Sequence, residues 1–254
     1  MSASAVTDAR AARRELERLL ETEPSTLGEA VGPEAIERLE HYVALLLTAN
    51  ERLNLTRVTE PAAIARLHLL DALSALPHVT SERPERALDL GSGGGVPGIV
   101  LAVVTPETHW TLVDSVGKKA AALAGFVDAL GLSNVDIRAA RAEDLGRGSD
   151  RATFDLVTAR ACAALPVLLE YALPLLRIGG RLIAWKGSMT DAEAEAGRIA
   201  AAELGGGEAA ILPTGIATLG DHVLVVVPKE RATPARYPRR PGHPARHPLG
   251  TTRG

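Results

Sequence analysis

The stretch Ala87-Leu-Asp-Leu-Gly-Ser-Gly-Gly-Gly-Val-Pro-Gly98 decides the fold of this chain. An apolar segment runs here into a cluster of glycines, and Pro97 suits the first turn of a helix. Glycines at positions 91, 93 and 95 allow a tight turn, and they let a ligand approach the backbone where a Cβ atom would intrude. We therefore predict a strand, a ligand-binding turn and a helix, in that order.

Short apolar segments alternate with helical segments on both sides of this stretch. We predict seven strands, at residues 87–90, 110–114, 135–138, 154–158, 181–185, 209–212 and 222–227. A helix is expected at 118–130, with Gly131 as its stop signal. Alternating strands and helices are typical of an α/β fold with a doubly wound, mostly parallel sheet.

The chain divides into three predicted regions. Residues 1–80 are expected to form an N-terminal helical cap, since helices are predicted to begin at Pro33 and Pro61 and both carry apolar side chains at helical spacing. Residues 81–227 hold the sheet. Residues 228–254 contain six of the sixteen prolines and few apolar side chains, so we expect an extended tail that is mobile until it is bound or packed.

Composition excludes several classes of protein. Of the 254 residues, 46% are hydrophobic and 23% are charged, as in soluble globular chains. No apolar stretch approaches the roughly 20 residues of a membrane-spanning helix, and no secretory signal is seen, so we expect a cytoplasmic protein without a membrane partner. The single cysteine, Cys162, excludes an internal disulfide and a cysteine-rich metal site, and we expect it to be a small core residue.

Charge is distributed unevenly along the chain. The tail from 228 to 254 carries seven Lys or Arg and one acid, a net charge of +6, whereas the other 21 cations and 30 anions give −9. This polarity predicts an anionic partner for the tail, the alternative being a merely solubilising segment.

Two nucleotide cofactors use such a glycine loop. Gly93, Gly95 and Gly98 satisfy the dinucleotide pattern G-x-G-x-x-G, but Asp89 would repel a pyrophosphate, whereas it would favour the cationic sulfonium of S-adenosylmethionine (AdoMet). Asp114 is expected to accept hydrogen bonds from ribose hydroxyls or to cap the next helix, and neither role separates the cofactors. With a Gly-Gly turn at 179–180 before another apolar strand, the pattern favours a class I AdoMet-dependent methyltransferase core.

Seven landmarks between Tyr42 and Leu249 make the resemblance specific. They are Asn54-Leu55-Thr56, His68-Leu-Leu-Asp71, the loop at 89–98, Leu112-Val-Asp-Ser115 with Lys118-Lys119, Arg160-Ala-Cys-Ala163, Lys186-Gly187 and Tyr237-Pro-Arg-Arg-Pro-Gly-His-Pro-Ala-Arg-His-Pro-Leu249. In these the sequence resembles the small-subunit ribosomal RNA methyltransferase G family. It departs from the family's usual pattern at two positions: Ala72 stands where a serine is common, and Cys162 stands where an aliphatic residue is common.

The resemblance implies AdoMet-dependent methylation of guanine N7 at position 527 of 16S rRNA, in the 530 loop of the small ribosomal subunit. Matched residue by residue, the cofactor site comprises Gly91 and Val96 in the loop, Ala142 and Glu143 after the third strand, and Arg160 after the fourth. Gly93, Gly95 and Asp114 are added to this cofactor site from the loop and strand pattern.

The expected chemistry needs no general base, because guanine N7 already carries an available lone pair. Arg160 and Lys186 are predicted at the carboxyl ends of strands, where such sheets bind ligands. We expect Arg160 to hold the cofactor or orient the base and Lys186 to contact RNA, unless each is an ion-paired cation. Arg239, Arg240 and Arg246 of the tail are expected to bind RNA phosphates.

Other motifs are interpreted structurally. Asn54-Leu55-Thr56 is expected to end a helix or face the substrate, and His68 and Asp71 are expected to be a buried hydrogen-bonded pair, since two such residues are too few for a metal site. No metal site is predicted.

Three rival functions remain open from the sequence. They are an NAD-dependent oxidoreductase, a non-catalytic RNA- or ribosome-binding protein, and a methyltransferase for a small metabolite. We favour the rRNA enzyme, acting as a monomer on 16S rRNA or the small subunit and not on DNA.

Overall fold

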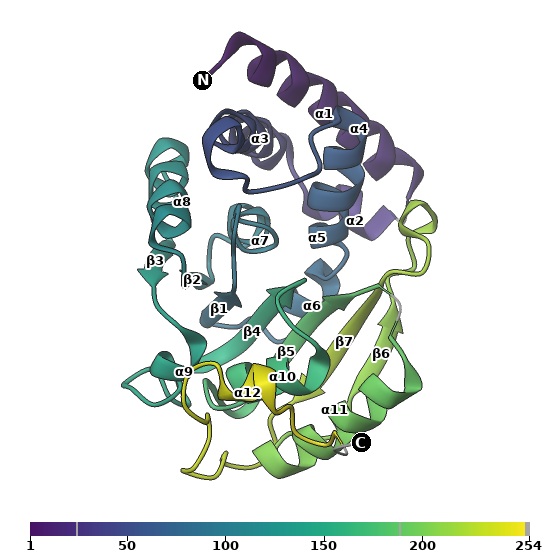
Figure 1. Ribbon diagram of the computed structural model, residues 1–254. Coiled ribbons are helices and arrows are strands. Elements are labelled where there is room, and N and C mark those ends of the chain that lie inside the picture. The colour runs from purple at the N-terminus through teal and green to yellow at the C-terminus, as the bar shows by residue number, and fades with distance from the viewer. Residues whose placement is uncertain (24, 188, 252–254) are drawn as a thin grey trace.

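The computed structural model describes residues 1–23, 25–187 and 189–251 and contains a seven-stranded sheet between two layers of helices (Figure 1). Its spatial order is β3-β2-β1-β4-β5-β7-β6, and β7 alone runs antiparallel to its neighbours. The strands are β1 Arg86–Leu90, β2 His109–Asp114, β3 Val135–Ala139, β4 Phe154–Arg160, β5 Leu176–Lys186, β6 Ala210–Pro213 and β7 Val223–Pro228. All seven predicted strands and the predicted fold class are confirmed.

Helices cover both faces of the sheet and form the cap above it (Figure 1). Those of the cap are α1 Ala3–Thr22, α2 Ser25–Ala30, α3 Pro33–Leu53, α4 Pro61–Ile64, a π-helical segment Ala65–Leu70, α5 Asp71–Leu73 and α6 Leu76–Thr80. The others are α7 Gly98–Val104, α8 Gly117–Leu130, α9 Ala142–Leu145, α10 Leu165–Ala172, α11 Asp191–Leu204, a 3-10 turn Ala217–Leu219 and α12 His243–Arg246. The predicted start at Pro33 is confirmed, as is the stop at Gly131, which has φ +62°.

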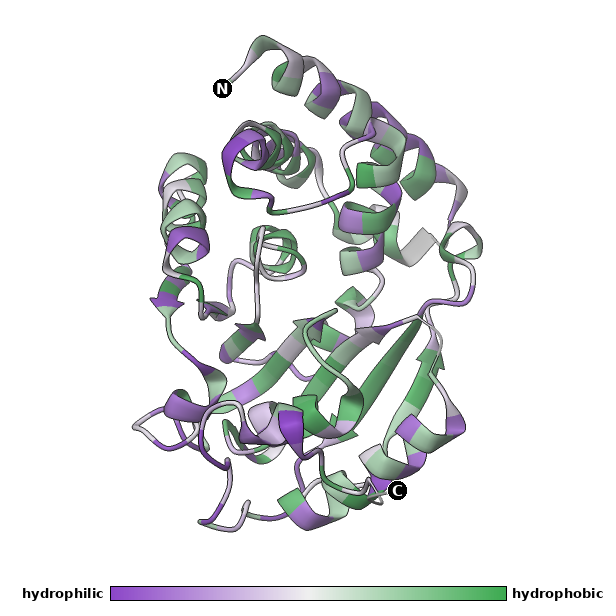
Figure 2. Ribbon diagram, in the orientation of Figure 1, coloured by the Kyte–Doolittle hydropathy of each residue, from purple (hydrophilic) through white to green (hydrophobic). Residues whose placement is uncertain are grey.

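Apolar side chains on the two sides of the sheet form two hydrophobic clusters. Figure 2 colours the hydrophobic residues of the strands and helices green. One cluster joins the sheet to α7, α8 and the cap, with Leu39 and Tyr42 beside Ile99. The other joins the sheet to α10 and α11. The cap therefore shares one core with the sheet. None of the described helices is both long and apolar enough to cross a lipid bilayer.

The glycine pair of β5 differs from its predicted role. Gly179 and Gly180 lie inside the strand, at a register shift in which Leu176 pairs with Phe154 and Arg181 with Leu156. Gly179 has φ +86°, and a Cβ atom on Gly180 would lie 2.7 Å from the Asp155 carbonyl oxygen. The pair thus forms a bulge that keeps β5 continuous, not a turn before it.

The described part of the tail is packed against the core, in contrast to the predicted mobile segment. Lys229 is buried and its Nζ donates to the Leu204 carbonyl oxygen at 2.9 Å, and Tyr237 is buried as well. Arg151 donates to the Tyr237 and Thr233 carbonyl oxygens, each at 2.7 Å. These hydrogen bonds and buried residues hold the tail in place, although it has few apolar side chains. Its low hydrophobicity therefore did not show that it packs against the core.

Candidate functional site

The glycine loop between β1 and α7 has the conformation that the sequence predicts. Gly91, Gly93 and Gly95 have φ values of +69°, +55° and +103°, in the left-handed region that favours glycine. A Cβ atom on Gly95 would lie 2.6 Å from Cδ1 of Ile99, and one on Gly91 would lie 3.1 Å from Cβ of Cys162. At the carboxyl end of β1 the backbone is exposed at Gly91 and partly exposed at Gly93, where a ligand can approach it, whereas Gly95 is buried.

Asp89 lies buried beneath this loop, so the expected effect of its carboxylate on a cationic cofactor stays a prediction. Side chains alternate along β1, and that of Asp89 points into the core, where it is fully buried. Its carboxylate accepts hydrogen bonds from the Thr158 hydroxyl at 2.8 Å and the Gly98 amide at 3.3 Å. Burial raises the pKa of Asp89 to about 6. The residue joins β1, β4 and the start of α7.

Asp114 braces the loop from the end of β2. One carboxylate oxygen accepts from the Gly93 amide at 3.0 Å and the other from the Val116 amide at 2.8 Å. The carboxylate thus fixes both the loop and the chain entering α8. Its contact with a ribose remains a prediction.

A hollow of about 280 Å³ opens at the carboxyl ends of the parallel strands. It contains three predicted cofactor residues, Gly91, Ala142 and Glu143, which lie after β1 and β3. Its full lining is Leu90, Gly91, Val113, Ser115, Ala140, Arg141, Ala142, Glu143, Cys162, Tyr171, Gly242 and Ala245. We call it the cofactor hollow. Cys162 is exposed here and is not the small core residue that the sequence predicts.

A smaller hollow of about 160 Å³ shares Gly91 with the cofactor hollow. It brings together predicted residues of the loop and of β4, namely Gly93, Val96 and Arg160, with His68 and Thr56 of the cap. Adjoining hollows at the carboxyl edge of a parallel sheet suit an elongated nucleotide ligand beside a second reactant. A larger hollow of about 790 Å³ lies between α1 and α3 and contains no predicted site residue.

Arg160 is held by the cap. Its guanidinium donates to the Leu67 carbonyl oxygen at 2.6 Å, to the Asp71 carboxylate at 3.2 Å and to Nδ1 of His68 at 3.3 Å. The other oxygen of Asp71 accepts from Nδ1 of His222 at 2.9 Å. The predicted pair of His68 and Asp71 is thus buried and hydrogen-bonded, but through Arg160. This network fixes the guanidinium at the edge of the smaller hollow.

The contacts of His68 define its protonation state. A guanidinium can only donate, so Nδ1 of His68 must accept and Nε2 carries the proton. Nε2 then donates to the Thr56 hydroxyl, 2.8 Å away. Burial, and after it the charge of Arg160, lowers the pKa of His68 to about 4. The imidazole is therefore neutral at pH 7 and adds no charge to the site.

Lys186, at the end of β5, is ion-paired, which is the alternative that the sequence left open. Its ammonium group lies 2.6 Å from the Glu193 carboxylate and donates to the Ala163 carbonyl oxygen at 3.1 Å. Two of its three N–H donors are thus engaged, and its contact with RNA stays a prediction.

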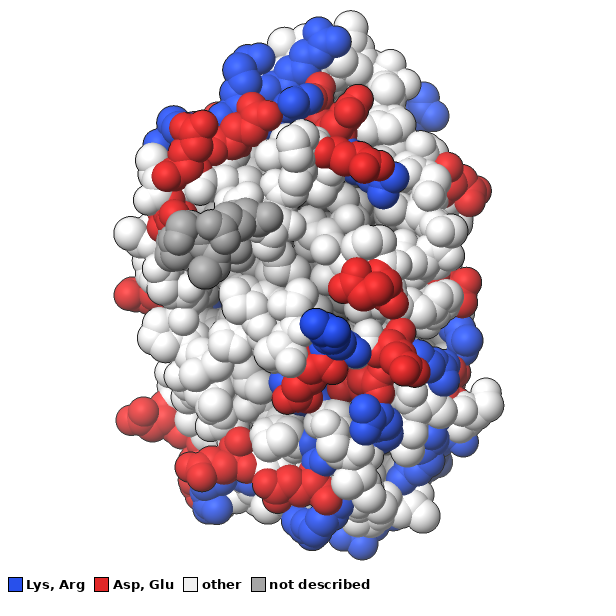
Figure 3. All heavy atoms as spheres, turned by 180° about the vertical axis from the view of Figure 1, so that it is seen from behind, with Lys and Arg blue, Asp and Glu red and all other residues white. Residues whose placement is uncertain are grey.

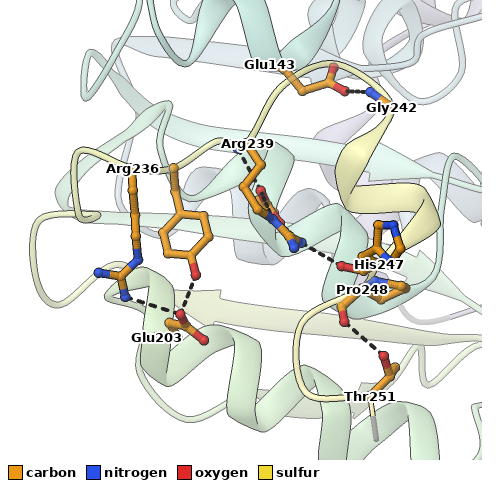
Figure 4. Close-up of polar contacts among 10 residues, drawn as sticks. Glu143, Glu203, Arg236, Arg239, Gly242, His247, Pro248 and Thr251 are labelled. Atoms are coloured by element: carbon orange, nitrogen blue, oxygen red, sulfur yellow. Dashed lines mark hydrogen bonds and ion pairs between the residues drawn. The ribbon is translucent and has the colours of Figure 1, made fainter. Parts of the chain in front are cut away.

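The C-terminal strap, residues 237–249, closes one side of the cofactor hollow (Figure 4). The Gly242 amide donates to the Glu143 carboxylate at 2.9 Å, and Ala245 of α12 lines the hollow. Arg239 anchors the strap, since its guanidinium makes a bidentate contact with the fully buried carboxylate of Glu170, 2.6–3.0 Å away. The side chain of Arg239, predicted to bind RNA, is thus engaged internally.

The other two tail residues predicted to bind RNA, Arg240 and Arg246, are exposed. Nine of the twelve residues that line the cofactor hollow were not predicted as site residues, among them Tyr171, Gly242 and Ala245. The C-terminal landmark at 237–249 was the only signal for the last two, and it did not reveal where the strap lies.

AdoMet fits this site in its general features. Bare glycine backbone borders the place where its amino acid part would lie. Glu143, 4% exposed, presents a carboxylate to the wall of the cofactor hollow, where an adenosine can donate hydrogen bonds. Arg160 presents a fixed cation at the smaller hollow.

Comparison with known proteins supports the same cofactor. The model of the family described as rRNA small subunit methyltransferase G matches residues 35–214. A protein of that name from Roseiflexus castenholzii is 46% identical over 84% of this chain and 92% of its own length, and one from Deinococcus radiodurans is 43% identical over 91% and 92%.

Solved structures show the fold. The cofactor-bound protein Rv0187 from MTB superposes with a TM-score of 0.54 at 20% identity, covering 75% of this chain and 91% of that one. The S-adenosylmethionine-dependent methyltransferase SibL superposes with a TM-score of 0.50 at 18% identity, covering 78% and 73%. The predicted class I methyltransferase fold is confirmed, and AdoMet is the cofactor that goes with this family and fold.

Proposed function

Because this chain belongs to the rRNA small subunit methyltransferase G family, we propose that it transfers a methyl group from AdoMet to N7 of guanine 527 (conventional numbering) in the 530 loop of 16S rRNA. The observation that carries the proposal is the joining of two hollows at Gly91. Ala142 and Glu143 lie in one, and the fixed Arg160 lies in the other with Gly93 and Val96. This arrangement provides one place for a cofactor and an adjacent place for a base.

The residues act by positioning. AdoMet supplies an electrophilic methyl group on a sulfonium, and guanine N7 needs no deprotonation to attack it. Glu143 and the glycine loop hold the cofactor, and Arg160 orients the reactants from the edge of β4. Holding two reactants in near-attack geometry contributes about 7–11 kcal/mol. His68 is a poor base, because its Nδ1 accepts from Arg160 and its pKa is lowered to about 4, and the reaction needs no proton to be removed.

Asp71 acts on Arg160, not on the substrate. Its buried carboxylate holds the guanidinium on one side and His222 on the other. Arg160 thereby keeps one orientation before the reactants arrive, which reduces the cost of ordering it on binding.

We also propose that the enzyme acts as a monomer in the cytoplasm, on 16S rRNA or the small subunit and not on DNA. The exposed Arg240 and Arg246 support an RNA contact, because arginine binds phosphate oxygens in a bidentate manner. The labelling assay described next, run once with naked 16S rRNA and once with small subunits, decides which of the two is methylated.

The test is to incubate purified protein with tritiated AdoMet and small subunits from a strain that lacks this gene, and to map the label at nucleotide resolution. We expect label on guanine N7 in the 530 loop, and its loss in Arg160→Ala. Arg198→Ala is the matched control, since Arg198 is exposed and paired only with Glu195 on α11. Label at another nucleotide, or none while AdoMet still binds, contradicts the proposal.

A further inference from the structure

A second hollow beside the C-terminal strap is lined only by basic residues. It has a volume of about 250 Å³ and is formed by Arg147, which follows α9, and by Arg236, Arg239, Arg240 and His243 of the tail. On the face shown in Figure 3, by contrast, the two signs of charge are interspersed. A concave site whose lining has no carboxylate selects an anion.

The cations of this basic hollow are not equally available. Arg239 is held by Glu170, and Arg236 pairs with Glu203 at 3.3 Å while 66% of its side chain is exposed. Nε of Arg147 donates to the Pro238 carbonyl oxygen at 3.0 Å, which orients the guanidinium without neutralising it. The exposed Arg240 has no side-chain partner among residues 1–23, 25–187 and 189–251. Arg147 and Arg240 therefore provide two uncompensated guanidinium groups, the groups that bind phosphate oxygens best.

The position of the basic hollow relates it to the substrate of the proposed reaction. Gly242 and Ala245 line the cofactor hollow, while Arg240 and His243, which alternate with them along the same segment, line the basic hollow. A polyanion bound there lies one segment of chain away from the cofactor. On the basis of the proposed function, we infer that the basic hollow binds a backbone phosphate of the RNA whose base is methylated, with Arg147 and Arg240 as its principal contacts.

The test measures binding of a labelled RNA fragment containing the 530 loop at several salt concentrations. Arg240→Ala is expected to weaken binding about fivefold to tenfold and Arg147→Ala/Arg240→Ala further, with the slope of log affinity against log salt reduced by about 0.7 for each lost phosphate contact. Arg240→Lys, which keeps the charge, should retain most of the affinity. AdoMet affinity without RNA should stay that of the wild type.

Arg18→Ala is the matched control, because Arg18 is an exposed, ion-paired arginine on α1, at the other end of the molecule (Figure 1). Equal affinity and salt slope in Arg240→Ala and Arg18→Ala overturn the inference. So does a loss of AdoMet affinity in Arg240→Ala, which indicates a displaced strap. If the wild-type protein methylates no RNA, the proposed function fails; if it methylates RNA and the variants bind normally, only this inference fails.

Discussion

Two segments of different origin border the cofactor hollow, the glycine loop at 91–98 through Gly91 and the C-terminal strap at 237–249 through Gly242 and Ala245. The loop is a local structure: its shape follows from glycines that are neighbours in the sequence and adopt left-handed backbone conformations. The strap reaches the same hollow from the far end of the chain and is held by contacts with α9, α10 and α11 (Figure 4). One binding site thus combines a segment whose conformation can be predicted from its local sequence with a segment whose position depends on contacts with residues far away in the sequence.

The largest expected effect comes from breaking the anchor of the strap. Arg239→Ala leaves the fully buried Glu170 carboxylate without its guanidinium, and breaking such a pair costs about 3–5 kcal/mol. We expect this loss in the free energy of unfolding, measured by urea denaturation, together with at least tenfold weaker AdoMet binding.

Arg236→Ala is its control, because the Arg236 ion pair is largely exposed and such pairs contribute about 1 kcal/mol or less. If the two variants are equally stable, the ion pair with Glu170 does not anchor the strap.

A smaller effect is expected from the loop. A Cβ atom on Gly98 would lie 2.7 Å from the Asp89 carboxylate and 2.9 Å from Cγ of Leu112, both in the core, so Gly98→Ala should cost about 1–3 kcal/mol of stability. Thermal unfolding, followed with and without AdoMet, measures this loss of stability. Gly117→Ala makes the same chemical change at a helix start with no atom within 4 Å, and should be neutral. Equal melting temperatures for the two variants contradict the packing argument.

Disturbing the contact between the strap and Glu143 should cost about 1 kcal/mol of AdoMet binding free energy. Gly242 has φ +77°, and alanine in this conformation costs about 1–2 kcal/mol, although a Cβ atom there meets only a side-chain nitrogen of Arg246 at 3.8 Å. Gly242→Ala should therefore weaken AdoMet binding about fivefold in titration calorimetry while the sheet stays folded. Unchanged affinity would mean that the Gly242 amide does not shape the hollow.

The smallest effect concerns the cap, whose His68 lines the smaller hollow. The folded state lowers the pKa of His68 from 6.5 to about 4, so below pH 6.5 the unfolded chain binds more protons and stability falls as the pH decreases. Between pH 7 and 6 this costs less than about 1 kcal/mol. Asp89, whose pKa is raised to about 6, acts in the opposite direction, so the measurement compares wild type with His68→Gln. A constant difference in stability across this pH range contradicts a neutral buried His68.

Much of the site was predictable, because its signals are local. The strands, the stop at Gly131 and the left-handed Gly91, Gly93 and Gly95 follow from propensity and backbone sterics over a few residues. The burial of Asp89 and its contacts with Thr158 and Gly98 were not foreseen, because the direction of its side chain depends on strand alternation, which the loop pattern does not contain. Cys162 was misjudged because an apolar sequence context does not show that the residue borders a hollow.

The sequence by itself determined the order of strands and helices, the glycine loop and the family to which the chain belongs. Tertiary structure alone decided that Arg160 is held by Asp71 and His68, that Lys186 is paired with Glu193, and that the proline-rich tail covers the cofactor hollow. The physical reason is range: backbone conformation responds to adjacent residues, whereas the partner of a charged side chain is chosen only when the folded chain brings distant segments together and removes them from water.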